Sequence, residues 1–259
     1  MSRVSILALA LGLAASSLAL TASAATPSAN TPSAAITAAI ADVNRPQADR
    51  DRDGDRKPAE MLAFAGVKPG DKVVDFMPGA GYFTRLFAKA VGPKGRVYTL
   101  LPGELATRSQ KAVDGQKALA QDKAYGNIVP LVQPVNAPVF PEKVDVVWTS
   151  QNYHDLHDAF LGPADVAAVN KAIFDALKPG GVYIVLDHAG DKGSGLRDTE
   201  TLHRIDPETV KKEVEAAGFV LDGEDDALRN SADNHSLKVF DPSLRGHTDQ
   251  FVFKFRKPK

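Results

Sequence analysis

The amino-acid sequence predicts an α/β fold in which a mostly parallel sheet of seven strands carries helices on both faces and ends on an antiparallel strand. Three observations predict this fold. Short apolar runs alternate with segments of helical spacing along most of the chain. The run at 182–187 is apolar at successive positions, as expected of a central parallel strand that is covered on both faces. The runs that begin at Phe219 and Gln250 have no helical segment between them, so they predict a closing hairpin.

The first strand, turn and helix give the clearest chemical signal in the chain. The apolar run Lys72–Phe76 contains the acid Asp75, and a turn that bears Gly79 and Gly81 follows it. Apolar residues then recur at helical spacing from Phe83. Glycines let a backbone approach a ligand closely, an acid can accept hydrogen bonds from ligand groups, and a helix N-terminus favours negative charge. The unit therefore predicts a nucleotide-binding strand, turn and helix.

The other elements are expected from their apolar runs and from the glycines and prolines between them. Pro58 and Pro207 stand where helices would begin, because proline is tolerated in the first turn, and Asp206 is a typical N-cap. Pro130 places its strand near an edge of the sheet, since proline cannot donate to a ladder. The expected strands are 96–101, 128–132, 144–149, 182–187, 219–221 and 250–255. The expected helices are 36–43, 58–64, 104–123, 163–177 and 207–217.

The N-terminal stretch has the features of a secretory signal peptide. The basic residue Arg3 precedes an apolar stretch, and small residues lead to an A-x-A cleavage site that ends at Ala24. We therefore expect residues 1–24 to be a signal peptide, residues 25–57 a disordered leader and N-terminal extension, and residues 58–259 one domain. The expected location is the bacterial periplasm or the medium outside the cell. An uncleaved membrane anchor is the alternative for the same stretch.

The composition of the chain indicates which kinds of fold, partner and site to expect. With 44% hydrophobic and 24% charged residues, the 259-residue chain has the composition of a globular protein with a sizeable core. The formal net charge of -1 gives no reason to expect a nucleic-acid partner. Beyond the N-terminal stretch, no segment approaches the roughly 20 apolar residues of a membrane span. The absence of cysteine excludes disulfides, thiolate metal sites and a cysteine nucleophile.

Several segments resemble motifs of the class I S-adenosylmethionine (SAM)-dependent methyltransferases. Residues 73–81 resemble the first SAM-binding motif, 94–98 the entry to the second strand, and 176–181 the segment before the fifth strand. Glu215–Phe219 resembles the start of the sixth strand. More closely, the chain resembles a group of secreted bacterial predicted methyltransferases, on the strength of Arg56-Lys57-Pro58 and the segment Leu202-His203-Arg204-Ile205-Asp206-Pro207.

The resemblance implies a Rossmann-like fold, a methyl-transfer reaction and SAM as the cofactor, but not a substrate. From the sequence as a whole we expect an enzyme that acts on an unidentified small molecule. The cofactor-binding residues that the resemblance implies are Asp75, Met77, Pro78, Gly79, Gly81, Glu104, Asn152 and Tyr153. Two positions depart from the pattern of the family. Met77 holds the place of its first glycine. Leu101 stands where an acid is expected to bind the ribose hydroxyls, and Glu104 is the nearest acid.

The loop after the fourth expected strand supplies the candidate catalytic residues. Ligands of open α/β sheets bind outside the carboxyl ends of the strands, where His154 and Asp155 are expected. The pair resembles the His-Asp of many small-molecule O-methyltransferases, in which the histidine removes a proton from the acceptor. The acceptor atom is expected to be oxygen or nitrogen. The alternatives are that these side chains only cap the next helix, or that His154 and His157 bind a divalent cation, although the sequence alone assigns no metal site.

Two other functions fit parts of the sequence. Residues 49–60 match the calcium-loop pattern D-x-D-x-D-G-x5-E letter for letter, which would suit a calcium-binding envelope protein. Arg56 at the usually apolar eighth position and Pro46 before the loop argue against a helix–loop–helix calcium site. The other function is that of a binding protein that keeps the methyltransferase fold without catalysis, and Met77 and Leu101 favour it.

Overall fold

The structure is a computed structural model that describes Met1 and residues 32–162 and 164–259. The expected signal peptide and the leader up to residue 31 lie outside the described residues, apart from Met1. Within the described part of the chain, no helix is both long enough and apolar enough to cross a membrane.

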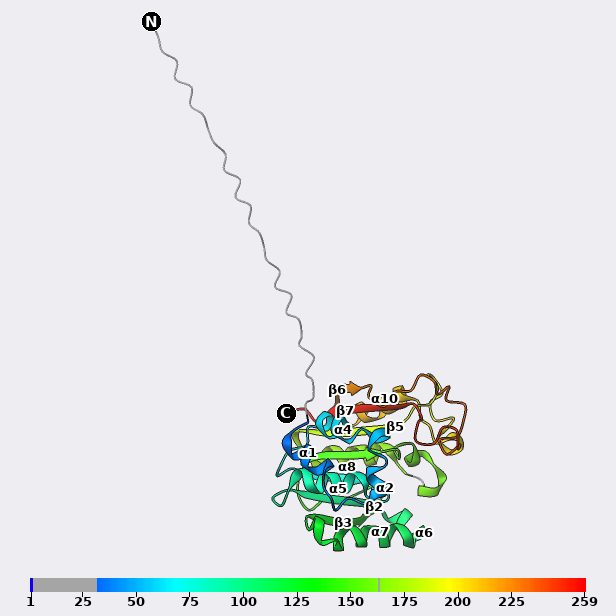
Figure 1. The fold of residues 1–259 in the computed structure, drawn as a ribbon. Helices are drawn as coiled ribbons and strands as arrows, with labels where there is room; N and C mark the ends of the chain where they lie inside the picture. The colour runs from blue at the N-terminus through cyan, green and yellow to red at the C-terminus, as the bar shows by residue number, and fades with distance from the viewer. Residues whose placement is uncertain (2–31, 163) are drawn as a thin grey trace.

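A seven-stranded sheet forms the centre of the molecule, as the sequence predicts. Its order is β3-β2-β1-β4-β5-β7-β6, and Figure 1 shows the strands stacked from β3 to β6. The first five strands run parallel, whereas β7 is antiparallel to both β5 and β6. The strands are β1 Lys72–Phe76, β2 Arg96–Pro102, β3 Ile128–Gln133, β4 Val144–Ser150, β5 Leu177–His188, β6 Val220–Asp225 and β7 Gln250–Arg256.

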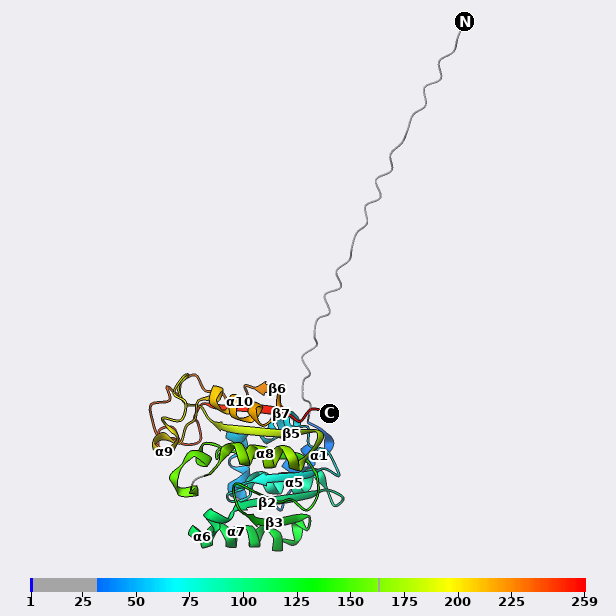
Figure 2. The same cartoon turned by 180° about the vertical axis from the view of Figure 1, so that it is seen from behind.

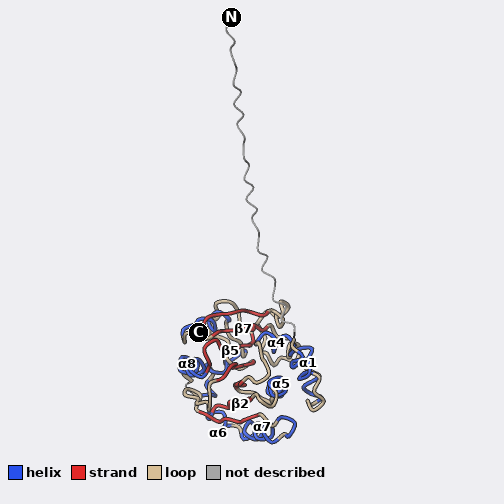
Figure 3. The backbone as a smooth tube through the Cα atoms, turned by 90° about the vertical axis from the view of Figure 1, so that its left-hand side faces the viewer, coloured by secondary structure: helices blue, strands red, loops and turns tan. Residues whose placement is uncertain are grey.

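Helices cover both faces of the sheet, with one hydrophobic cluster on each side. Figure 3 shows α8 on one side of the strands and α1, α4 and α5 on the other. Successive residues of β1 point to opposite faces, so Val73 packs in the cluster beneath α5 and Val74 in the cluster beneath α8. The longer helices are α1 Ala34–Ile40, α4 Pro58–Ala65, α5 Tyr82–Val91, α7 Gln110–Gln121, α8 Val166–Ala176 and α10 Pro207–Ala216.

The segment before α4 folds against this body. Ile36 and Ala39 of α1 are buried in the same cluster as α5. Two one-turn helices follow, α2 Gln47–Arg50 and α3 Asp53–Arg56, within the stretch that contains the calcium-like pattern. Arg45 is 1% exposed and pairs with Asp53 at 2.6 Å, which ties this segment together.

Three local elements differ from those expected. The helix expected at 104–123 is two helices, α6 Gly103–Arg108 and α7, because the Ser109 hydroxyl caps α7 by accepting a hydrogen bond from the amide of Ala112. β5 begins at Leu177, before the expected Gly-rich turn, where the Gly180 amide donates to the carbonyl of Lys257. A short helix, α9 Thr199–Leu202, was not expected, and Figure 2 shows it on the side to which β5 points.

Candidate active site

The turn between β1 and α5 forms one wall of a cavity. Met77, Gly79 and Gly81 all have positive φ, at 52°, 55° and 81°. A Cβ at Gly81 would lie 2.6 Å from the end of the Leu119 side chain, so any other residue there would have to displace Leu119 as well as adopt a strained positive φ. A Cβ at Gly79 would meet no atom within 4 Å, so this part of the turn is open toward the space in front of it.

Asp75 lies beside this turn, near the carboxyl end of β1. It is 3% exposed, and its carboxylate accepts a 2.6 Å hydrogen bond from the Thr84 hydroxyl. Burial raises the pKa of Asp75 to about 7, against the opposing effects of the Thr84 hydrogen bond and of the Arg56 charge. Near neutral pH the side chain is therefore shared between its carboxyl and carboxylate forms.

A cavity of about 390 Å³ opens over the carboxyl ends of β1 and β4. Of the residues that the sequence suggests, Asp75, Met77, Pro78, Gly79, Asn152 and Asp155 line it. The other lining residues are Asp49, Arg52, Arg56, Ala80, Tyr82, Phe83, Leu101, Leu105, Ala112, Gln116, Ser150 and Gln151. Gly81, Glu104, Tyr153 and His154 are not among the lining residues, although the sequence places them in the site.

Glu104 is held away from the cavity by the backbone beyond β3. Its carboxylate accepts a hydrogen bond from the Val135 amide at 3.1 Å. Leu101 lines the cavity where the family pattern would place an acid. Gln116, which comes from α7 and is 2% exposed, is one of the polar side chains that line the same cavity. Among the described residues, neither amide atom of Gln116 has a hydrogen-bond partner.

Two arginines from the N-terminal segment supply positive charge to the cavity. Arg52 and Arg56 both line it. The Arg56 guanidinium lies 4.8 Å from the ring centre of Tyr82 and donates a 2.8 Å hydrogen bond to the Gln151 side chain. Burial and the neighbouring charge of Arg52 lower the pKa of Arg56 to about 10, so it still carries its charge at neutral pH. Sequence reasoning missed both residues as ligands, although Arg56 belongs to a segment that carries the family resemblance.

The loop after β4 places its polar residues in two directions. Asn152 faces the cavity and donates to the backbone carbonyls of Phe76 and Met77, at 3.2 and 2.9 Å, which locks this loop to the end of β1. Tyr153 points the other way, is fully buried and donates a hydrogen bond to Glu213. Burial, with the Glu213 charge, raises the pKa of Tyr153 well above its usual value.

The candidate catalytic pair His154 and Asp155 lies together at the edge of the cavity. Asp155 lines the cavity, whereas His154 is 2% exposed and lies behind it. The His154 ring contacts Asp187 through Nδ1 at 2.9 Å and Asp155 through Nε2 at 3.2 Å. Burial alone would lower the pKa of His154, but the carboxylates of Asp187 and Asp155 raise it to about 10. The ring therefore stays protonated on both nitrogens at neutral pH and holds Asp155 in position.

The calcium-like segment does not form a calcium site in the described residues. Its carboxylates are directed to different arginines: Asp49 pairs with Arg85 at 2.7 Å and Asp53 with Arg45. Asp53 also accepts a hydrogen bond from the Tyr82 hydroxyl. A calcium loop needs its oxygens to converge on one point, so these arginines prevent the site that the letter pattern suggests.

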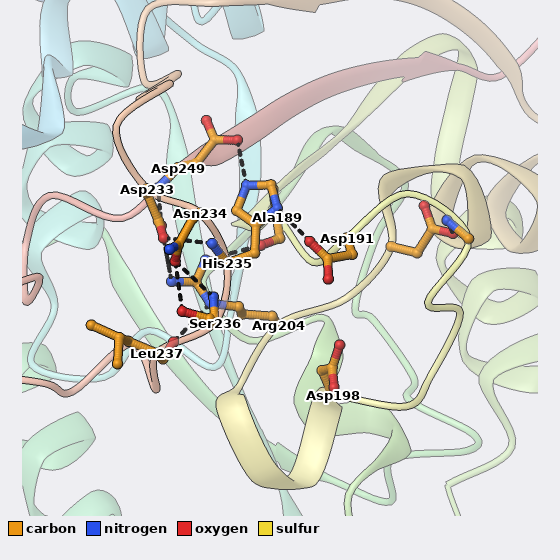
Figure 4. Close-up of polar contacts among 12 residues, drawn as sticks. Ala189, Asp191, Asp198, Arg204, Asp233, Asn234, His235, Ser236, Leu237 and Asp249 are labelled. Atoms are coloured by element: carbon orange, nitrogen blue, oxygen red, sulfur yellow. Dashed lines mark hydrogen bonds and ion pairs between the residues drawn. The ribbon is translucent and has the colours of Figure 1, made fainter.

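The segment between β6 and β7 is fixed by a buried ion pair. Figure 4 shows Arg204, which is fully buried, directed at Asp233, with their closest atoms 2.9 Å apart. The Arg204 guanidinium also donates to the carbonyls of Ala189 and Leu237. His235 lies between Asp191 and Asp249, at 3.3 and 3.0 Å. These contacts tie the segment to the end of β5 and give it a structural role.

Comparisons with known proteins agree with this fold. No known protein-family profile matches the chain. The chain is 30% identical over 129 residues to the ubiquinone/menaquinone biosynthesis C-methyltransferase UbiE of Hydrogenovibrio crunogenus, covering 49% of this chain and 45% of that protein. It is 30% identical over 129 residues to a protein-L-isoaspartate O-methyltransferase of Ignicoccus hospitalis, covering 49% and 52%. The matches thus span about half of these relatives.

Longer matches and solved structures extend the similarity. UbiE of Shewanella woodyi is 26% identical over 197 residues, 74% of this chain and 66% of that protein. A SAM-dependent methyltransferase of Aquifex aeolicus superposes with a TM-score of 0.57 at 17% identity, covering 84% of this chain and 96% of that one. The [4+2]-cyclase SpnF gives the same TM-score at 18% identity, covering 82% and 81%. At these identities the structures establish the shared fold.

Proposed function

We propose that the chain is a class I SAM-dependent methyltransferase, which binds SAM in the cavity over β1 and β4 and methylates a small molecule. The observation that carries the proposal is the set of side chains around this one cavity. It combines an open glycine turn, two arginines, a buried carboxylate and a buried amide without a partner.

The lining residues fit the groups of the cofactor one by one. SAM carries a carboxylate, an ammonium, a ribose with two hydroxyls and an adenine, and it supplies an activated methyl group. Arg52 and Arg56 suit the carboxylate, since charge-assisted hydrogen bonds are the strong ones. The Gln116 amide suits the ribose hydroxyls in place of the acid that the family pattern places at Leu101. Leu101 and Leu105 offer apolar surface for the adenine.

Asp155 is the residue placed to act on the acceptor. Its side chain lines the cavity and is 19% exposed, so a substrate can reach it. A carboxylate there can orient a hydroxyl or an amine and accept its proton as the methyl group arrives. His154 fixes the position of Asp155 through the contact at its Nε2. The relatives include C- and O-methyltransferases, and this polar group favours an acceptor with a polar hydrogen on oxygen or nitrogen.

The experiment that tests this function measures the transfer of a labelled methyl group from SAM to an acceptor. The purified chain is incubated with SAM that carries a tritiated methyl group, together with a desalted small-molecule extract or a desalted protein extract. We expect label in the small-molecule extract only, and a loss of most of it in Asp155→Asn but not in Glu224→Gln, which lies on exposed β6. Label confined to protein, or no label although SAM binds, would contradict the proposal.

We also propose that the chain is exported, which rests on the signal-like features of residues 1–24. Expression of the full chain in a bacterium, followed by fractionation and N-terminal sequencing, tests this directly. A periplasmic or secreted product that begins at Ala25 is the expected result. An intact N-terminus in the cytoplasmic fraction would contradict it.

A further inference from the structure

Four possible metal ligands converge beside the cavity, from segments far apart in the sequence. His154 and Asp155 come from the short η2 turn His154–His157, Asp158 follows it, and His203 comes directly after α9. One ligand atom from each of the four lies within 4.8 Å of the other three. Among the described residues, this is the group of histidines and carboxylates that could hold a metal ion.

The separations between these atoms suit a single ion. His154 Nε2 lies 3.2 Å from His203 Nδ1 and 3.2 Å from Asp155 Oδ1. His203 Nδ1 lies 3.9 Å from Asp155 Oδ1 and 4.0 Å from Asp158 Oδ2. Four ligands at tetrahedral angles around zinc would stand roughly 3.3 Å apart, given metal–ligand bonds near 2 Å. These pairs, at 3.2 to 4.0 Å, are already near this separation, and the farthest pair, at no more than 4.8 Å, would have to close by up to about 1.5 Å.

The ring of His154 is held as a metal-binding histidine usually is. Asp187 is fully buried and accepts from His154 on two sides, from ring Nδ1 at 2.9 Å and from the backbone amide at 2.8 Å. A carboxylate on one ring nitrogen fixes the orientation of the ring and leaves the other nitrogen for the metal. An ion would take the place of the proton on Nε2.

Asp158 provides an independent sign that a ligand is missing from the cluster. Its side chain is 1% exposed and its Oδ1 has no hydrogen-bond partner among the described residues. The contact with His203 is made by the other oxygen, Oδ2. A buried carboxylate oxygen without a donor is costly, and a cation that Asp158 binds through both oxygens would satisfy Oδ1 as well. A hydrogen bond between the two histidine rings could explain their contact alone, but it would leave this oxygen unsatisfied.

We propose that His154, Asp155, Asp158 and His203 bind one divalent transition-metal ion of the zinc class. Two imidazole nitrogens and two carboxylate oxygens suit zinc, iron or manganese better than calcium or magnesium, which prefer oxygen ligands alone. His157 takes no part, since its Nε2 contacts Glu213 at 3.2 Å. Because Asp155 also lines the cavity, the ion would lie at the wall where the proposed acceptor binds.

A metal titration without SAM tests this site separately from the proposed function. The full chain is stripped with a chelator, dialysed, and titrated with Zn²⁺ by calorimetry and with Co²⁺ by visible absorption. We expect one ion per chain and the intense visible bands of a four-coordinate Co²⁺ site. His203→Ala should weaken binding about tenfold or more and remove these bands.

The control variant is His247→Ala, because that side chain is 68% exposed and lies outside the cluster. It should bind the metal as the native chain does. Because His203 also contacts the rings of His154 and Phe240, the metal-free melting temperature of His203→Ala is measured as well, so that a loss of folding is distinguished from a loss of metal binding. Asp158→Asn is the second variant and should weaken binding in the same way. Absence of stoichiometric binding, or native affinity in both His203→Ala and Asp158→Asn, would overturn the proposal.

Discussion

At the scale of the residue, Met77 shows how a departure from the family pattern is accommodated. Its φ of 52° lies in the left-handed region that glycine adopts most easily. Its side chain is only 9% exposed and packs in the cluster beneath α8. The strain of the backbone and the burial of the side chain therefore oppose each other at this position.

Paired substitutions at Met77 separate these two effects. Met77→Ala and Met77→Gly both remove the buried side chain, but only glycine removes the steric cost of positive φ. We therefore expect Met77→Gly to be more stable than Met77→Ala by about 1 kcal/mol. Urea denaturation of both variants measures this difference. An alanine variant as stable as the glycine variant would show that the turn does not hold this conformation.

Asp75 gives the site a pH dependence with a definite sign. Its folded pKa, about 7, lies above the value of 3.8 expected in the unfolded chain, so the folded state binds more protons between these values. Its contribution to stability is fully present below pH 4 and is lost as the pH rises through 7. Relative to Asp75→Asn, the free energy of unfolding of the native chain should fall by up to about 4 kcal/mol across this pH range. Urea denaturation of both proteins from pH 4 to pH 8 measures this change. A difference in unfolding free energy that stays constant with pH would contradict the prediction.

At the scale of the element, α7 links the fold to the site. Ser109 caps this helix, Leu119 packs against Gly81, and Gln116 faces the cavity with an amide that has no hydrogen-bond partner in the part of the chain that the structure describes. A buried amide without a hydrogen-bond partner lowers the stability of the folded chain. Because Gln116 lines the cavity, we infer that a bound ligand forms hydrogen bonds with this amide.

The substitution Gln116→Met tests whether this amide lowers the stability of the fold and raises the affinity for SAM. Methionine keeps the shape of the side chain and removes the unsatisfied amide, so the variant should be more stable by about 1–3 kcal/mol. Its affinity for SAM should fall about fivefold to tenfold, the loss of one hydrogen-bonding group. Thermal melting and calorimetry measure the two effects. A less stable variant with native affinity for SAM would contradict this role.

The N-cap of α7 at Ser109 should contribute measurably to stability. Ser109→Ala removes the hydroxyl that accepts from the Ala112 amide and should lower the free energy of unfolding by about 1 kcal/mol. Ser243→Ala is a control, because Ser243 is exposed and its hydroxyl bonds to the neighbouring Asp241 without capping a helix. Urea denaturation compares the two. An equal loss in both variants would mean that the cap does not divide α6 from α7.

At the scale of the whole molecule, the sequence predicted the strands of the sheet more completely than the residues of the site. Alternating apolar runs predicted seven strands and the closing hairpin, because the strand pattern is local and the burial of both faces repeats along the chain. The break at Ser109 was not predicted, because one helix was expected over 104–123, although serine is a common N-cap. The proposed roles of Arg56, Gln116 and His203 could not be predicted from the sequence, because each depends on segments that lie far apart in the chain and on how helices pack.

The measurement that tests the account most directly is a calorimetric titration of the purified chain with SAM and S-adenosylhomocysteine. The account predicts binding of one ligand per chain with a micromolar Kd, which corresponds to about −8 kcal/mol. Arg56→Ala should weaken this binding, whereas Arg197→Ala, whose side chain is 62% exposed, should leave it unchanged. No heat and no thermal shift with either ligand at millimolar concentration would contradict the account and favour a binding protein that keeps only the fold.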